Sequence, residues 1–483
     1  MENHTLLTDF YQLTMMQGYF EANHHKRVVV FDMFYRENPG GNGFAIMAGI
    51  EQLMAYIDNL HFTQDDLSYL RSLQIFSEDF LSYLENFNFS GNIDAIPEGT
   101  VVFPGEPLIT VTAPIVEAQL IETALLNIVN HQALIATKAA RVCYAADGDP
   151  VLEFGLRRAQ GPDAGIYGAR AAVIGGCVAT SNVLAGQMFD IPVRGTHAHS
   201  WIMSFDSELA AFRAYAASFP GRSTLLVDTY DTLGSGVPNA IRCFDEMRAK
   251  GIKLANHGIR LDSGDFAYLS KESRKMLDAA GYEDAKITAS CDLDEVLIQS
   301  LKFQGAKIDT WGVGTSLITS RDCPAFGGVY KLVAARDDLG KMSPKIKLSE
   351  NPEKVTNPGT KKIYRIYDAA SRKIKADLIM LAYESIDESQ ELTLFDPVAT
   401  WKKMTLAPGE YYTRQLQVPI FRNGQRVYTS PSVMEIREFC AAEQDSLWDE
   451  FRRLINPHIM PVDLSQALYD LKHKMINEAR SGL

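Results

Sequence analysis

Two histidines stand two positions apart in the segment GTHAHSW (195–201), directly after a Gly-Thr step. The spacing allows three interpretations: a pair of metal ligands on one face of a strand, one catalytic imidazole beside a bystander, or two histidines without chemical function. Imidazole is a nucleophile, a proton carrier and a metal ligand near neutral pH. The residue types alone therefore do not distinguish the three interpretations, and the neighbouring sequence is needed.

Two further segments carry groups that suit a phosphate-bearing ligand. EFGLRRAQGPDAG (153–165) places Arg157 and Arg158 after an expected strand, and a guanidinium is a rigid fork of donors that matches phosphate or carboxylate. GVGTS (312–316) has glycines that let backbone N–H groups approach an oxyanion. A solvated arginine pair and an ordinary glycine turn are the alternatives.

Aspartates follow two other expected strands. GIRLDSGD (258–265) gives Arg260 and Asp262 the spacing that puts side chains on one face of a strand, where a structural ion pair is the alternative. VDTYD (227–231) places Asp228 where a carboxylate can accept the Nδ1 hydrogen of a histidine and hold its tautomer.

The elements that position these residues alternate between about residue 151 and residue 320. Helical patterns separate six short apolar runs: VLEFGL, MFDIPVRGTH, STLLVDTY, KLANHGIRLDSGD, KITASCD and IDTWGVGTS. Such alternation predicts βα units and a parallel sheet. Six units are fewer than the eight of a complete TIM barrel, so we expect an irregular α/β barrel with its ligand at the carboxyl ends of the strands.

A second α/β domain is expected on both sides of this core. The preceding IPEGTVVFPGEPLITVTAPI alternates apolar and polar residues and predicts antiparallel strands, and the sequence after residue 330 is again β-rich. We therefore expect residues 1–140 and 326–440 to form the second domain, residues 141–325 the barrel, and residues 441–483 a helical appendage.

The composition of the chain indicates its cellular compartment and excludes some classes of ligand. The 483-residue sequence has neither a long apolar run nor a signal-peptide pattern, so we expect a cytoplasmic protein without membrane contact. The six cysteines lack metal-ligand and CxxC spacing, which favours reduced thiols and argues against structural zinc. The net charge of −13 argues against nucleic-acid binding, so an anionic ligand needs local positive groups.

Seven ordered segments together resemble the nicotinate phosphoribosyltransferase family: TDFYQLTM (8–15), EFGLRRAQGPDAG, GTHAHSW, VDTYD, GIRLDSGD, GVGTS and GGVYKLV (327–333). The resemblance implies an irregular barrel of the type II phosphoribosyltransferase kind with a second α/β domain. It also implies a reaction of nicotinate with 5-phosphoribosyl 1-diphosphate (PRPP) that gives nicotinate mononucleotide and pyrophosphate. This reaction would be coupled to ATP hydrolysis and would serve the salvage route to NAD.

The same resemblance assigns the catalytic roles. In the family, two variable residues separate the Gly-Thr step from the histidine that ATP phosphorylates, so His199 would be the phosphohistidine. His197 would be a neighbour without a required role, and its substitution is expected to be nearly silent. Asp228 would support His199, and Asp262 would lie near the ribose hydroxyls or the magnesium-bound pyrophosphate.

Binding roles follow in the same way. Tyr11 and Phe154 would flank the pyridine ring, Thr196 would line the nicotinate pocket, and Arg260 would pair with the nicotinate carboxylate or the PRPP phosphates. The residues implied for phosphate binding are Arg157, Gly264, Gly314 and Thr315. An N-terminal aromatic enters the site from the partner subunit in relatives of this fold, so Tyr11 implies a homodimer with the active site at the subunit interface. Mg²⁺ would arrive with PRPP or ATP, without a dedicated protein site, and Asp262 is its candidate contact.

Other functions stay open at this point. A nicotinamide phosphoribosyltransferase would reuse the same arginine, aspartate and histidine set. A non-catalytic binding protein of the same fold would have lost the motifs at the strand ends, and none of them is broken here. Quinolinate phosphoribosyltransferase is disfavoured because it is a shorter chain that uses no phosphohistidine.

Overall fold

The computed structural model describes residues 3–349 and 355–481, which form two units. One unit comprises Met1–Leu134, Ala325–Pro431 and Glu438–Leu483, and the other comprises Ile135–Pro324 and Ser432–Arg437. The outermost residues of the predicted parts, 1–2 and 482–483, lie outside the described residues. None of the described helices is long and apolar enough to cross a bilayer.

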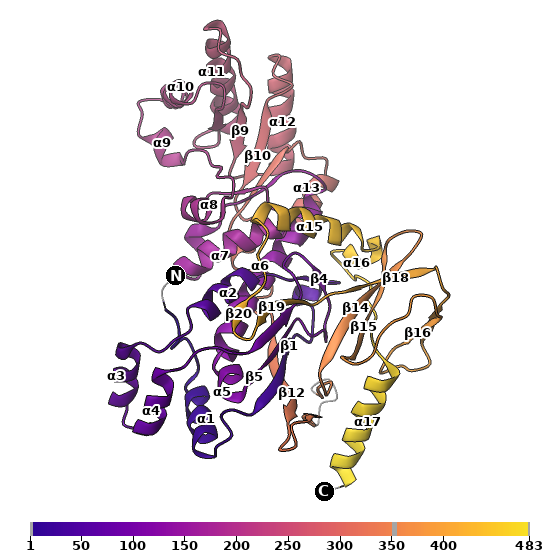
Figure 1. The fold of residues 1–483 in the computed structure, drawn as a ribbon. Helices are drawn as coiled ribbons and strands as arrows, with labels where there is room; N and C mark the ends of the chain where they lie inside the picture. The colour runs from indigo at the N-terminus through magenta and orange to yellow at the C-terminus, as the bar shows by residue number, and fades with distance from the viewer. Residues whose placement is uncertain (1–2, 350–354, 482–483) are drawn as a thin grey trace. The chain divides into compact units, whose positions relative to one another are not determined.

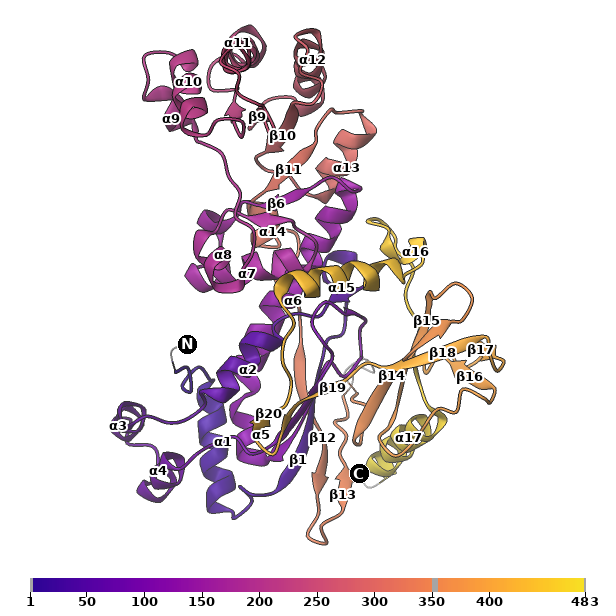
Figure 2. The same ribbon diagram turned by 45° about the horizontal axis from the view of Figure 1, so that its top comes forward.

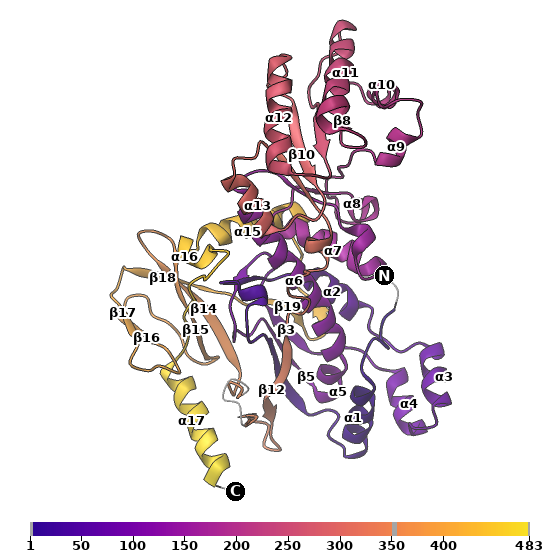
Figure 3. The same ribbon diagram turned by 180° about the vertical axis from the view of Figure 1, so that it is seen from behind.

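The first unit is built on a seven-stranded antiparallel sheet with the order β13-β12-β1-β5-β3-β19-β20. The β-branched and aromatic run VVVFDMF forms β1, whose centre is buried on both faces. Helix α5 packs beside β1 and β5, and Figure 3 shows it next to β5. The elements up to α6 are α1 (Phe10–Glu21), β1 (Val28–Phe34), β2 (Ala45–Ile46), α2 (Ile50–Asp58), α3 (Gln64–Ser72), α4 (Glu78–Glu85), β3 (Asn92–Ala95), β4 (Val101–Val102), β5 (Ile109–Pro114), α5 (Ile115–Leu120) and α6 (Glu122–Ala146).

A smaller sheet completes the first unit, with the strand order β18-β14-β15-β21. The last strand, β21, pairs in parallel with β15, so the segment expected to be a helical appendage contributes a strand to this sheet, and α17 lies against β15. The remaining elements of this unit, with α15 running across its boundary, are β12 (Val329–Arg336), β13 (Met342–Pro344), β14 (Lys361–Asp368), β15 (Ile374–Leu381), β16 (Leu392–Phe395), β17 (Lys403–Leu406), β18 (Tyr411–Gln415), β19 (Val418–Arg422), β20 (Gln425–Arg426), α15 (Val433–Asp445), α16 (Asp449–Arg452), β21 (Val462–Leu464) and α17 (Gln466–Ser481).

The second unit holds a six-stranded sheet with the order β7-β6-β11-β10-β9-β8, in which every neighbouring pair is parallel. Figure 1 shows α11 and α12 beside β9 and β10, and Figure 2 shows β6, β11, β10 and β9 in succession. The α/β class is thus confirmed. Within the described residues the sheet is open, with β7 and β8 at its edges, and no closed barrel forms.

Short polar residues start the helices of this unit as helix-capping chemistry predicts. The side chains of Asn182, Ser207, Asp265 and Asp294 each accept a hydrogen bond from a backbone N–H in the first turn of the following helix. The elements are β6 (Val151–Glu153), α7 (Pro162–Ile174), β7 (Ala179–Thr180), α8 (Val183–Phe189), α9 (His199–Met203), α10 (Glu208–Ser218), β8 (Thr224–Leu226), α11 (Val237–Ala249), β9 (Gly258–Leu261), α12 (Phe266–Ala279), β10 (Lys286–Ser290), α13 (Glu295–Phe303), β11 (Thr310–Val313) and α14 (Thr315–Ile318).

One predicted strand, MFDIPVRGTH, is wrong. Its first residues end α8, Asp190 adopts a left-handed conformation after that helix, and Val193 makes only a single bridge, to Thr180. Pro192 has no N–H to donate to a ladder, which explains why pairing does not extend. The strand at this place in the sheet is β7, and it falls in sequence predicted to be helical because α7 stops before Gly176, whose φ is +129°.

Candidate active site

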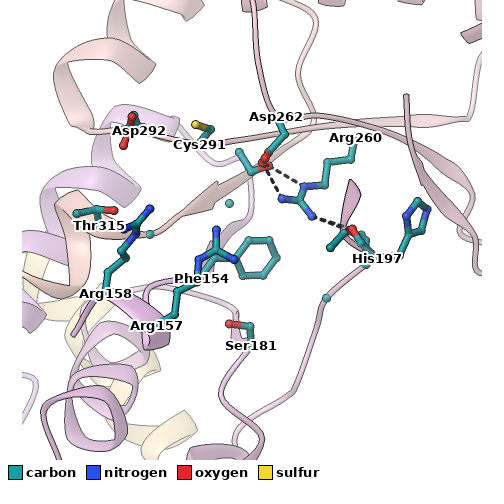
Figure 4. A pocket seen from close by; sticks show the side chains of 16 residues that line it. Phe154, Arg157, Arg158, Ser181, His197, Arg260, Asp262, Cys291, Asp292 and Thr315 are labelled. Carbon is teal, nitrogen blue, oxygen red and sulfur yellow. Dashed lines mark hydrogen bonds and ion pairs between the residues drawn. The ribbon is translucent and has the colours of Figure 1, made fainter. Parts of the chain in front are cut away.

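Most of the predicted site residues gather around one cavity of the second unit, at the edge where the parallel strands end (Figure 4). Its volume is about 330 Å³. It is lined by Phe154, Arg157, Arg158, Ser181, Gly195, Thr196, His197, Ala198, Arg260, Asp262, Ser290, Cys291, Asp292, Gly312, Gly314 and Thr315. Three arginines and two aspartates give this lining a net positive charge, although the whole chain carries −13.

Seven predicted site residues line this cavity: Phe154, Arg157, Thr196, Arg260, Asp262, Gly314 and Thr315. Four others do not. His199 and Asp228 both contact Asp262. Gly264 forms the turn that follows Asp262, with φ +83°. Tyr11 belongs to α1 of the first unit and is 48% exposed. A role of Tyr11 at the cavity therefore stays a prediction.

Arg260 is held by four hydrogen bonds. Its Nε donates to Ser290 Oγ at 2.7 Å, Nη1 to Thr196 Oγ1 at 2.9 Å and to the His197 carbonyl at 3.3 Å, and Nη2 to Asp262 Oδ1 at 2.6 Å. A guanidinium has five N–H donors, so the protein already occupies most of this fork.

Asp262 is the centre of the acidic side of the cavity. Its Oδ1 accepts hydrogen bonds from Arg260 and, at 2.5 Å, from Ser290 Oγ. Burial alone would raise the pKa of Asp262, but the charge of Arg260 and the hydrogen bonds from Ser290 and Arg260 outweigh it and hold the pKa below its ordinary value. The carboxylate is therefore an anion at neutral pH.

His199 is the first residue of α9 and stands next to Asp262. Its Nε2 lies 3.6 Å from Asp262 Oδ2, its Nδ1 lies 3.1 Å from Thr229 Oγ1, and 39% of its side chain is exposed. The Nδ1 partner is thus a hydroxyl, and Asp228, expected there, faces elsewhere: its Oδ2 accepts at 2.7 Å from the Asp262 backbone N–H and from Ser263 Oγ. Asp228 therefore fixes the loop that carries Asp262.

His197 differs from His199 in its surroundings. It is 9% exposed, its Nε2 accepts at 3.3 Å from the Leu226 backbone N–H, and its ring packs on Tyr215 with centroids 4.6 Å apart. Burial lowers the pKa of His197 to about 4, to which the charges of Arg260 and His199 contribute. His197 is therefore a neutral, packed imidazole whose Nε2 lone pair is already used by the Leu226 N–H. This burial indicates that removal of the side chain would cost stability, while a silent effect on activity stays a prediction.

Phe154 and Gly312 of β11 shape the floor of the cavity. The Arg260 guanidinium lies 6.0 Å from the centroid of the Phe154 ring. A Cβ on Gly312 would lie 2.7 Å from that ring, so only glycine leaves room for the ring in this position. A flat aromatic ring bordered by a guanidinium suits a flat anionic ligand.

The other end of the cavity is positively charged. Arg157 and Arg158 are exposed, and within the described part of the chain no ion pair occupies either guanidinium. Gly314 and Thr315 follow β11 and line the same cavity, and Figure 4 shows Thr315 beside Arg158. Free guanidinium groups next to a glycine turn are the arrangement that binds phosphate oxygens.

Sequence reasoning missed five residues of this site: Ser181, Thr229, Ser290, Cys291 and Asp292. Their positions at strand ends could have indicated them. Ser181 follows β7, Ser290 ends β10 and is followed by Cys291 and Asp292, and Thr229 lies within VDTYD. The Cys291-Asp292 step has φ values of 88° and 35°, a left-handed turn that sequence does not announce for these residue types. No group of three or more His, Cys, Asp or Glu side chains in the described chain suits a metal ion.

An α/β protein with an anion-binding cavity at the ends of its parallel strands is the class that this fold and site define. Models of nicotinate phosphoribosyltransferase match the chain over residues 6–130 (N-terminal domain), 150–362 (family) and 360–472 (C-terminal domain). The nicotinate phosphoribosyltransferase of Bacillus subtilis (strain 168) is 48% identical, covering 99% of this chain and 96% of its own. The human protein of that name is 33% identical, covering 97% and 96%.

Solved structures agree. The crystal structure of human nicotinic acid phosphoribosyltransferase has a TM-score of 0.85 and 30% identity, and covers 97% of this chain and 99% of its own. A nicotinate-nucleotide pyrophosphorylase from Pyrococcus furiosus shares the fold, with a TM-score of 0.70 and 23% identity. The chain belongs to the nicotinate phosphoribosyltransferase family, as its ordered motifs predicted.

Proposed function

We propose that this protein transfers the phosphoribosyl group of PRPP to nicotinate, and that it couples the transfer to ATP hydrolysis through phosphorylation of His199. Family membership supports the transfer, and its placement in NAD salvage follows from the product, nicotinate mononucleotide. One observation supports the coupling: an accessible imidazole lies 3.6 Å from the carboxylate that holds Arg260.

The transfer needs orientation more than acid or base chemistry. The lone pair of the pyridine nitrogen attacks the anomeric carbon, a C–N bond forms, and the C–O bond to pyrophosphate breaks through an oxocarbenium-like state. Phe154 offers a face to the pyridine ring, and Thr196 and Arg260 lie at its border. Arg157, Gly314 and Thr315 bind the phosphates of PRPP at the other end.

His199 carries the phosphoryl group between ATP and water. Donation of the Nδ1 hydrogen to Thr229 leaves the lone pair on Nε2, which attacks the γ-phosphorus. The N–P bond forms, the bond from phosphorus to the β,γ-bridging oxygen breaks, and ADP leaves. Water later cleaves the N–P bond and regenerates the imidazole.

The coupling follows from charge. A phosphoryl group on Nε2 would place two negative charges beside the ionised Asp262. Repulsion between these like charges would move the Asp262 carboxylate away from His199. Arg260 would then lose its carboxylate partner and turn that part of its fork to the carboxylate of nicotinate. Tighter nicotinate binding would thus be limited to the phosphorylated enzyme.

Magnesium fits this site as a companion of the substrates. The oxygen ligands that Mg²⁺ prefers are present as Asp262 and Asp292, and Asp262 Oδ2 accepts no hydrogen bond from the described residues. When bound, Mg²⁺ would neutralise charge on the leaving pyrophosphate. Asp262 would hold it through that free oxygen.

The assembly and compartment complete the proposal. Tyr11 would reach the pyridine ring of the partner subunit in a homodimer, and its 48% exposure in a single chain is compatible with such a contact. A cytoplasmic location is proposed because PRPP and ATP are substrates.

The test is mononucleotide formation, measured by mass spectrometry with PRPP and magnesium. Nicotinate and nicotinamide are compared, each with and without ATP. We expect turnover of nicotinate that ATP enhances, with ADP formed. Preference for nicotinamide would show that the proposed substrate is wrong. A rate of nicotinate turnover that ATP does not change would argue against the phosphohistidine. No product with either ring would favour a binding protein.

A further inference from the structure

Glu153 is a fully buried carboxyl group directly beneath the cavity. It is the last residue of β6, and it is 0% exposed. Because β6 lies between β7 and β11, Glu153 is paired with Thr180 on one side and with Val313 on the other. The residues that follow these three strand ends, Phe154, Ser181 and Gly314, all line the cavity, so Glu153 stands where three segments of the site meet.

The carboxyl group bonds to two of these segments. Its Oε1 accepts from the Gly155 backbone N–H, and its Oε2 accepts from Thr180 Oγ1 at 2.6 Å. Its own carbonyl accepts from the Ser181 backbone N–H at 2.9 Å. Burial raises the pKa of the Glu153 carboxyl, and the hydrogen bonds from Thr180 and Gly155 counter only part of that rise. The carboxyl group is therefore held in a buried place by these hydrogen bonds, at a cost to stability.

The local chain is shaped around this carboxyl. A Cβ on Gly155 would lie 2.5 Å from Ile318 Cβ and 2.9 Å from Glu153 Oε1, so the chain folds back tightly over the carboxyl only with glycine there. Gly155 precedes the 3-10 turn Leu156–Arg158, and its carbonyl accepts from the Arg158 N–H at 2.7 Å. The bond from Gly155 to Glu153 thus sets where the two cavity arginines begin.

We propose that Glu153 is a positioning residue, whose two carboxyl oxygens tie the arginine turn of Arg157 to the β7 segment that carries Ser181. Glutamine is a weaker substitute, because its NH₂ can keep the contact with Thr180 only by donating to a hydroxyl oxygen that already accepts from the Asn182 backbone N–H. The inference rests on the proposed binding of PRPP phosphates by Arg157. Glu153 would thereby fix the distance between the phosphate end of the cavity and the cavity floor.

The experiment uses the full chain and four substitutions that change few atoms. Thr180→Val removes the donor to Oε2 and keeps the shape, Thr180→Ser restores the hydroxyl, and Glu153→Gln replaces one acceptor. Thr288→Val is the matched control, since Thr288 is a buried threonine of the same sheet, on β10, outside the cavity lining. Thermal unfolding and the separate KM values for PRPP and nicotinate are measured for each.

We expect Thr180→Val and Glu153→Gln to raise the KM for PRPP about tenfold, as misplacement of a binding group does. Thr180→Ser should restore it, and Thr288→Val should leave the KM for PRPP unchanged. If Thr180→Val and Glu153→Gln lower only the melting temperature, Glu153 is a core residue and the proposal is overturned. Arg157→Ala separates the two proposals: an unchanged KM for PRPP in that variant contradicts the binding role, whatever the Glu153 result.

Discussion

The Nε2 atom of His199 lies 3.6 Å from Oδ2 of Asp262, and the other oxygen of the same carboxylate accepts a hydrogen bond of 2.6 Å from Arg260. A charge placed on the imidazole is therefore separated from the guanidinium by a single carboxylate. Under the proposed function, this short chain of contacts would let ATP change nicotinate binding, and the first three predictions examine it.

Removal of the imidazole should separate the two reactions. His199→Ala is expected to abolish ATP hydrolysis while a slower, ATP-independent transfer continues, because the groups that bind nicotinate and PRPP remain. Phosphate release and mononucleotide formation are measured in the same samples. His24→Ala, an exposed histidine of the first unit, is the control. A His199→Ala enzyme that still couples both reactions would rule out the phosphohistidine.

Arg260→Ala should weaken the binding of nicotinate. A charge-assisted hydrogen bond contributes about 1.5–3 kcal/mol, so the dissociation constant should rise by roughly one to two orders of magnitude. Isothermal titration with nicotinate measures it directly. Unchanged affinity would exclude Arg260 as the partner of the carboxylate and would point to Arg157 or Arg158.

Asp262→Asn should partly replace the effect of ATP. The neutral amide still occupies the place of the carboxylate but no longer holds Arg260 as an ion pair, so nicotinate should bind more tightly than to the wild type when ATP is absent. Titration with and without ATP gives the comparison. The idea fails if the variant binds nicotinate no better than the wild type without ATP.

Gly312→Ala should disturb the pyridine site alone. The added Cβ lies 2.7 Å from the Phe154 ring, which has to move into the cavity, and we expect the KM for nicotinate to rise about tenfold with a smaller change for PRPP. Gly18→Ala is a control, since no atom lies within 4 Å of the added Cβ there. Equal changes in both KM values would instead indicate a general distortion.

His197 should make stability depend on pH. Its pKa is about 4 in the folded chain against 6.5 ordinarily, so between these values the unfolded chain binds more protons and stability rises with pH. Acidification through this window should remove up to about 3 kcal/mol. Urea unfolding across the window should show a weaker pH dependence for His197→Gln than for the wild type. Parallel curves for the two proteins would contradict the assigned pKa.

Patterns that are local in sequence predicted the parallel sheet and seven of the cavity residues, because strand, helix and strand-end positions are set within a few neighbouring residues. The predicted strand MFDIPVRGTH failed for a local reason too: Pro192 and the left-handed Asp190 weigh more than its apolar residues.

Side-chain partners could not be read in this way. Asp228 and Thr229 are neighbours in sequence, and only the direction of the chain after β8 decides that Thr229 faces His199 while Asp228 faces Ser263. In the sequence Glu153 resembles any other strand residue. Its proposed positioning role depends on a hydrogen bond from Thr180, which lies on another strand. Contacts between strands carry this information, and they require the fold.

The strand order also bears on how the chain acquires its activity. β11 is the last of the six parallel strands to be synthesised, yet it lies between β6 and β10, near the middle of the sheet. Until it inserts, β7 with β6 and β8 with β9 and β10 are two separate groups, and the halves of the cavity have no common floor. The pairing of distant segments makes such a step slow. Binding competence should therefore emerge late in refolding, after hydrogen-exchange protection has appeared within each group of strands.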